Sequence, residues 1–215
     1  MIETHDGSVA LLLSVDDKPC SDDDAAKEQA RLQGLLDDPG KQHHRKQVQE
    51  QDTARALKVL RVLPTAFLYT FAGQGMDGQT QVEKFAFTPN PKFDPPDLET
   101  EILTALTGEI WVDPAHGRVT HLEGHLQHDV DFGWGVLGRL NKGGWITIEQ
   151  ADVGGDQWRI VRFQMSMNGR VLFKTRNFDT TEIESQFMPV PSNLDYRQAI
   201  GMLLASRTTA APTGQ

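Results

Sequence analysis

The chain has 215 residues, of which 38% are hydrophobic, and a formal net charge of −9. This length fits one domain with a sizeable core, and no apolar run is long enough to cross a bilayer, so no transmembrane segment is expected. The acidic balance argues against nucleic acid and anionic membrane surfaces as the main partners, because both are recognised by basic surfaces. The single cysteine, Cys20, excludes a disulfide within the chain.

The first third of the chain predicts two helices after a short strand. Residues 8–15 are mostly apolar and predict a buried strand. Ser21 precedes three aspartates, a pattern that is typical of a helix N-cap followed by an acidic first turn. The sequence at 37–40 ends this helix, and a second helix is predicted over residues 41–63, stopped by Pro64.

From residue 67 onward, short runs rich in aromatic and β-branched residues alternate with turn residues, which predicts antiparallel strands. The predicted strands cover residues 67–72, 79–88, 107–113, 119–128, 132–140, 145–150, 157–168, 170–177 and 180–187. Asn168-Gly169 is the strongest hairpin turn signal among them. Helices are predicted over residues 98–106 and 194–206, with a disordered tail over residues 207–215.

This order of elements predicts an α+β fold, because no crossover helices separate the strands. We expect a single domain over residues 1–206. Gly133 and Gly135 interrupt the predicted strand at 132–140, and glycines inside a strand favour sharp bends. The sheet is therefore expected to be strongly curved and open.

Four segments resemble a known family. They are KPCSDDDAAKEQARL, FTPNPKF, LTGEIWVDPAHGRVTHLEGHL and FGWGVLGRLNKGGWITIEQ. Over residues 8–187 the chain resembles a poorly characterised cell-envelope branch of the bacterial outer-membrane lipoprotein-sorting (LolA/LolB-like) superfamily. The resemblance implies a curved antiparallel sheet, an open half-barrel with helices covering its concave face, and a periplasmic or cell-envelope location. It also implies a signal peptide and a first helix and strand ahead of Ser8, so an N-terminally truncated chain is expected.

The resemblance further implies a cavity for acyl chains, and strand alternation suggests which side chains line it. The candidate lining residues are Phe85, Phe87, Trp111, Phe132, Trp134, Val136, Val161, Phe163, Met165 and Met167. The predicted function is non-enzymatic binding of a lipid, an acylated protein or another hydrophobic ligand, without a cofactor. The alternative for each residue is core packing against the helices.

A weaker hypothesis is a metal-dependent enzyme. His121, Glu123 and His125 alternate along one strand and share a face, and imidazole and carboxylate groups are zinc ligands. Same-face neighbours lie about 6.5–7 Å apart, which leaves the first and third groups distant for one metal. The alternative interpretation is that these side chains lie on an outer face of the sheet that is exposed to solvent.

The second hypothesis, ranked ahead of the metal-dependent enzyme, is a sensory or structural interaction module of the envelope. Its sheet edge, or the polar helix segment at 41–51, would dock a protein partner. A hydrolase is disfavoured, because the sequence lacks a G-x-S-x-G motif and offers Cys20 no recognisable histidine partner.

Overall fold

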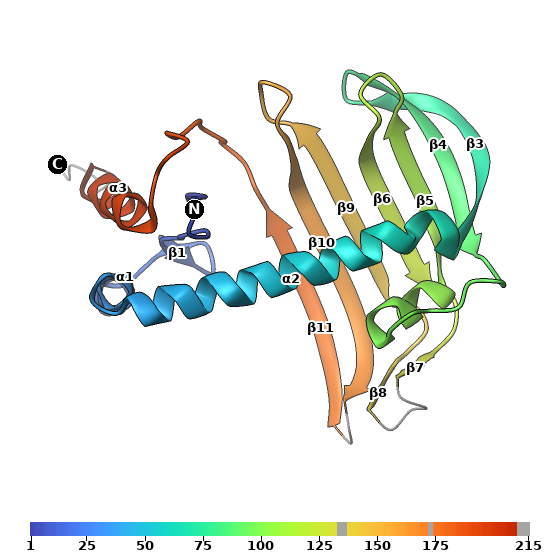
Figure 1. Cartoon of the computed structure of the whole chain (residues 1–215), viewed down its shortest axis with the longest axis horizontal. Helices are drawn as coiled ribbons and strands as arrows, with labels where there is room; N and C mark the ends of the chain where they lie inside the picture. Colours follow the sequence, from blue (N-terminus) through green and yellow to red (C-terminus); the bar gives the residue numbers. More distant parts are fainter. Residues whose placement is uncertain (133–136, 172–173, 210–215) are drawn as a thin grey trace. The chain divides into compact units, whose positions relative to one another are not determined.

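The computed structural model describes residues 1–132, 137–171 and 174–209 (Figure 1). The chain divides into two compact units. Met1–Ala56 and Met188–Gln215 form the first, called the helical unit below, and Leu57–Phe187 form the second, called the sheet unit. The single domain predicted over residues 1–206 stays a prediction.

Three α-helices belong wholly or partly to the helical unit. They are α1 (Asp22–Asp37), α2 (Pro39–Ala66) and α3 (Tyr196–Thr209), and α2 continues into the sheet unit. The Ser21 side chain accepts a hydrogen bond of 3.2 Å from the backbone N–H of Asp24, which confirms the predicted N-cap. Helix α2 runs past its predicted end at Pro64, because a proline in the last turn removes only one backbone donor.

The predicted buried strand at residues 8–15 is wrong. Only Ser14–Val15 forms a strand, β1, which pairs with β2 (Lys18–Pro19) and is exposed. Val9 is fully buried, but it makes an isolated bridge to Ile2. It packs into the core of the helical unit, whose buried residues are Val9, Leu32, Leu35, Leu194, Ala199, Ile200 and Leu203.

The sheet unit contains an antiparallel sheet of nine strands in the described part of the chain. The strands are β3 (Phe67–Asp77), β4 (Thr80–Pro89), β5 (Leu106–Asp113), β6 (Arg118–Leu126), β7 (Val130–Phe132), β8 (Gly138–Leu140), β9 (Trp145–Asp152), β10 (Trp158–Val171) and β11 (Lys174–Ile183). The strand order is β3-β4-β5-β6-β9-β10-β8-β7, and β11 pairs with β10 off this path. No pairing joins β3 to β11 among the described residues, so the sheet is open and the predicted α+β class is confirmed.

Two predicted hairpins differ from the structure. The predicted strand at 132–140 is divided into β7 and β8, which pair with each other, while β9 pairs with β6 and β10. The predicted turn Asn168-Gly169 lies inside β10, where both residues pair with β11. An added Cβ at Gly169 would overlap the backbone carbonyl of Arg139 on β8, so this glycine serves a close strand approach and not a turn. Parts of the predicted strands 170–177 and 180–187 join in one strand, β11, whereas Arg170 and Val171 belong to β10 and residues 184–187 form no strand.

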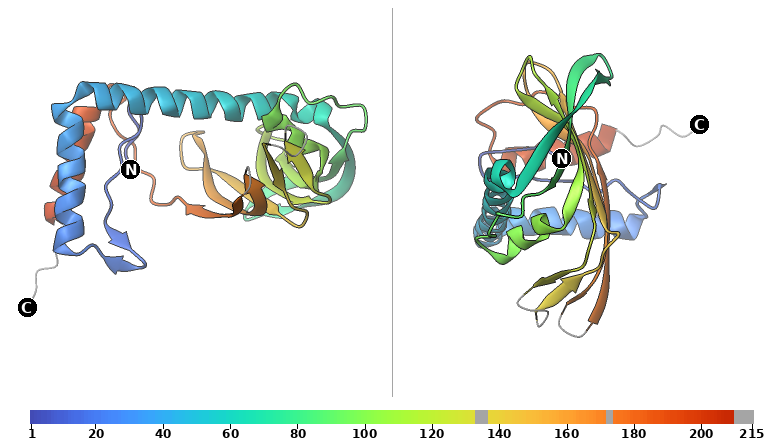
Figure 2. Two further views of the ribbon diagram at one scale, coloured as in Figure 1. Left: turned by 90° about the horizontal axis from the view of Figure 1, so that it is seen from below. Right: turned by 90° about the vertical axis from the view of Figure 1, so that its right-hand side faces the viewer.

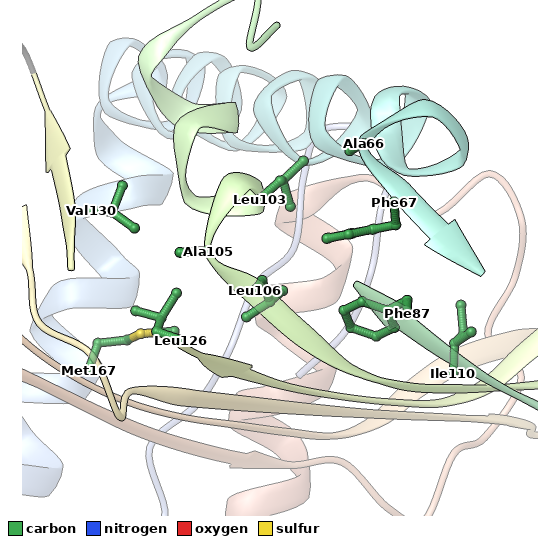
Figure 3. Close-up of a cluster of buried hydrophobic side chains, with 10 residues drawn as sticks. All are labelled: Ala66, Phe67, Phe87, Leu103, Ala105, Leu106, Ile110, Leu126, Val130 and Met167. Atoms are coloured by element: carbon green, nitrogen blue, oxygen red, sulfur yellow. The ribbon is translucent and has the colours of Figure 1, made fainter. Parts of the chain in front are cut away.

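One face of the sheet, called the inner face, is covered by the end of α2 and by a 3-10 helix, η1 (Leu98–Thr104), which lies within the helix predicted at 98–106. Figure 2 shows both elements on the same side of the sheet. The core between them contains Ala66, Phe67, Phe87, Leu103, Ala105, Leu106, Ile110, Leu126, Val130 and Met167 (Figure 3). Among the described residues, no helix is long and apolar enough to cross a membrane.

Candidate binding surface on the inner face of the sheet

A row of apolar side chains crosses the inner face at one level. Hydrogen-bond register pairs each member with the next on the neighbouring strand, from β3 through β4, β5, β6 and β9 to β10. We call this set the inner apolar row; it consists of Phe71, Phe85, Ile110, Leu122, Ile148 and Phe163. Register then pairs Phe163 with Glu182 on the edge strand β11, so the row ends at a carboxylate.

The inner apolar row is only partly covered. Ile110 is buried in the core, and Phe85 and Leu122 pack against that core while remaining half-buried. Ile148 and Phe163 are half-buried and lie outside the described core cluster. Phe71 is 56% exposed. The row therefore begins at an exposed aromatic ring and keeps accessible apolar surface on four of its other five members.

Two glycines leave β5 and β6 without side chains on the inner face at the level next to the inner apolar row. Gly108 on β5 and Gly124 on β6 are register partners, and the Leu106 side chain lies over Gly124. An added Cβ at Gly108 would overlap the backbone carbonyl of Glu123. Glycine is required here by close backbone approach. Gly133 and Gly135, which were predicted to bend the sheet, lie outside the described residues.

Most of the predicted lining residues in the described part of the chain lie on this face. Phe87 and Met167 belong to the core, and Phe85, Phe132 and Met165 pack against it. Phe163 belongs to the inner apolar row, and Val161 is the extra residue at a bulge between Ile160 and Arg162. Two of the predicted residues, Trp134 and Val136, lie outside the described residues.

Trp111 lies on the opposite, outer face of the sheet. Its register partners are Lys84 and His121, whereas the neighbouring Ile110 pairs with Phe85 and Leu122 on the inner face. The Lys84 ammonium sits 3.6 Å from the Trp111 ring centroid, and the His121 ring lies 4.5 Å from it. The indole N–H donates to Glu109. The cation–π contact with Lys84 and the packing of the His121 ring thus give the Trp111 side chain its partners on the outer face.

The candidate metal residues also lie on the outer face. His125 Nε2 is 2.8 Å from Glu123 Oε1, and His121 Nε2 is 3.9 Å from Glu123 Oε2. Glu123 thus lies between the two imidazoles as a shared partner. In the part of the chain that the structure describes, no group of three such side chains is arranged to hold a metal ion.

Sequence reasoning missed several members of the inner apolar row. Phe71, Ile110, Leu122 and Ile148 were not among the predicted lining residues, although Leu122 and Ile148 each lie between polar neighbours in their strands. Alternation identifies the face within one strand. It does not identify which residues of different strands lie at one level, because that depends on register.

Comparison of the chain with protein-family models, with curated proteins and with solved structures found no match. No family is therefore assigned, and the resemblance to lipoprotein-sorting proteins stays a hypothesis.

Proposed function

We propose that this is a non-enzymatic protein of the periplasm or cell envelope that binds a lipid, an acylated protein or another hydrophobic ligand along the inner apolar row, in a LolA-like half-barrel. The observation that carries the proposal is the partly covered apolar row across six strands. An extended acyl chain matches such a row in shape and chemistry, since binding needs apolar burial and few polar contacts.

The expected affinity follows from the hydrophobic effect. Each methylene that leaves water contributes about 0.8 kcal/mol. About ten buried methylenes would contribute about 8 kcal/mol, which corresponds to a dissociation constant near 1 μM before ordering costs are subtracted. Those costs weaken binding, so we expect micromolar or weaker affinity for a single acyl chain.

The test uses a fluorescent palmitate analogue and two variants of β3. Phe71 is 56% exposed on the inner face, and Leu68 is 52% exposed on the outer face of the same strand. We expect Phe71→Asp to raise the dissociation constant at least about tenfold, because a charge replaces apolar contact at the end of the row. Leu68→Asp is the matched control and should leave the affinity within about twofold of the unsubstituted chain.

Absence of saturable binding to the unsubstituted chain would overturn the proposal, as would equal losses in the two variants. Both substituted side chains are exposed, so both variants are expected to fold; circular dichroism checks this. Mass spectrometry of lipids that co-purify with the protein from its native cells then identifies the ligand class.

A further inference from the structure

Strands β3 and β11, two of the edge strands in the described sheet, differ in charge. Strand β3 carries no charged residue from Phe67 to Met76. Strand β11, which pairs only with β10 among the described strands, carries Lys174, Arg176, Asp179 and Glu182. Charged side chains on an edge strand oppose pairing with another chain, and their absence leaves an edge able to accept a further strand. By this criterion β11 is protected and β3 is not.

Strand β3 also exposes apolar side chains on both faces of the sheet. Phe71 and Tyr69, 56% and 40% exposed, lie on the inner face. Leu68, 52% exposed, lies on the outer face. A ligand along the inner apolar row would cover Phe71 but would leave Leu68 in water. An added strand beside β3 covers side chains on both faces at once.

We propose that β3 pairs in antiparallel fashion with β3 of a second copy of this chain, with Tyr69 opposite Tyr69 across a two-fold axis. A two-fold axis perpendicular to the sheet keeps the inner face of both copies on one side. Residues opposite each other must then point to the same face. This requires one residue to pair with its own counterpart in the other copy, with the axis midway between them.

The chain limits where this pairing can occur. Helix α2 ends at Ala66, directly before β3, and the register with β4 shifts after Phe71. A regular edge is therefore available over Phe67–Phe71, whose sequence is F-L-Y-T-F. Centred on Tyr69, the pairing places Phe67 opposite Phe71 and Leu68 opposite Thr70. Apolar and aromatic groups meet each other on the inner face, and no charges oppose one another.

The aromatic side chains beneath this edge form a cluster within each copy. Phe67 lies 4.6 Å from Phe87, and Phe71 lies 5.7 Å from Phe85, measured between ring centroids. Tyr69 lies 6.2 Å and 6.4 Å from Phe67 and Phe87. Pairing of two copies joins two such clusters on one face, since the exposed Phe71 of one copy meets Phe67 of the other. Aromatic cross-strand pairs are among the stronger contacts in sheets.

A second copy fits this edge better than an extension through β11. Pairing of β3 with β11 of another molecule would be heterologous and would continue into an open filament. The charges on β11 oppose that outcome. The β3–β3 contact closes after two copies and involves five residues from each strand, a small interface typical of a concentration-dependent dimer.

Sedimentation velocity of the full chain tests the dimer over about 1 to 500 μM. We expect the weight-average mass to rise towards twice the monomer mass. Leu68→Asp should raise the dimer dissociation constant at least about tenfold, because it places a charge inside the contact. The matched control is Ile183→Asp on β11, where the side chain is 61% exposed; its effect should stay within about twofold.

A mass that stays monomeric over this range overturns the proposal, and so does a dimer that survives Leu68→Asp. The result is separable from ligand binding, since Leu68 lies off the inner apolar row. Leu68→Asp should lose the dimer and keep the affinity for the palmitate analogue. Failure of palmitate binding with an intact β3 dimer would reject only the proposed function.

Cross-linking tests the register. With Cys20→Ser as the background, Tyr69→Cys places two thiols opposite each other at a Cα separation of about 4.5–5.5 Å, within the range that a disulfide spans. We expect a disulfide-linked dimer under mild oxidation. Met76→Cys, on the same strand beyond the bulge and 60% exposed in the native residue, should cross-link at least about tenfold more slowly. Equal rates would overturn the proposed register.

Discussion

Asp113 and His116 show how one buried carboxylate organises the turn between β5 and β6. Asp113 is buried, and its Oδ1 accepts backbone hydrogen bonds from Ala115 at 2.8 Å and from His116 at 3.4 Å. Its Oδ2 lies 2.6 Å from His116 Nδ1. The hydrogen bond from His116, followed by those from the backbone, lowers the pKa of Asp113. The same hydrogen bond, together with the Asp113 charge, raises the pKa of His116.

These shifts predict a pH-dependent stability. A raised folded-state pKa means that His116 stabilises the fold fully below its unfolded value of about 6.5, and that this contribution is lost as pH rises through the folded value. Asp113 contributes above about 3.8, and that contribution is lost as pH falls through its lowered pKa. We therefore expect His116→Gln to lower the melting temperature at about pH 5 and to have little effect at about pH 9.

Thermal melts followed by tryptophan fluorescence measure this difference at each pH. His43→Gln is the control, because His43 lies on α2 and contacts only Gln47 among the contacts described for its side chain. A melting difference for His116→Gln that stays constant between the two pH values contradicts the assignment of the ion pair.

At the scale of elements, the level of the sheet next to the inner apolar row depends on Gly108. An added Cβ at Gly108 would overlap the backbone carbonyl of Glu123, and neither backbone can move without disturbing the pairing of β5 with β6. At Gly75 on β3 the nearest atom is a flexible Lys84 side-chain carbon at 2.9 Å. The two glycines therefore differ in what a methyl group would meet.

We expect Gly108→Ala to lower the free energy of unfolding by about 2 to 3 kcal/mol, because the overlap forces the backbone to shift. Gly75→Ala should change it by less than about 0.5 kcal/mol, because the Lys84 chain can swing away. Urea unfolding followed by tryptophan fluorescence measures both variants. Equal effects of the two substitutions would show that strand approach at Gly108 is not tight.

Local signals predicted the helices well, since a cap such as Ser21 is read within a few residues of sequence. Strand pairing was harder, because it depends on contacts between distant segments. Asn168-Gly169 has the residues of a tight turn, yet the approach of β8 places it inside β10. Only tertiary contacts show whether such a glycine forms a turn or allows two strands to approach closely.

The candidate site was predictable in part for the same reason. Alternation put Phe85 and Phe87 on one face, and the structure agrees. Trp111 was also predicted to line the cavity, but its register with Lys84 and His121 sets it on the outer face. Bulges in β3, β6 and β10 shift the register by one residue, and a sequence pattern does not locate such shifts across strands.

At the scale of the whole chain, the two units have separate hydrophobic cores. The core of the helical unit and the core of the sheet unit share no residue. Helix α2 is the element common to both units. The described tryptophans, Trp111, Trp145 and Trp158, lie within the sheet unit, and Trp134 falls between residues 57 and 187 of the sequence. Tryptophan emission therefore reports on the sheet unit, and helical circular dichroism reports mainly on α1, α2 and α3.

Because a ligand stabilises the structure that binds it, the proposed function predicts a selective shift. At a free concentration of about one hundred times its dissociation constant, an acyl ligand adds about 2.7 kcal/mol to the stability of the unit that binds it. We expect a saturating palmitate analogue to raise the urea midpoint seen by tryptophan emission more than the midpoint seen by helical dichroism. The Phe71→Asp variant should lose this selective shift, since its row binds the acyl chain weakly. Equal shifts of both urea midpoints would mean that the two cores unfold together. If neither midpoint shifts, the acyl ligand does not bind the folded chain.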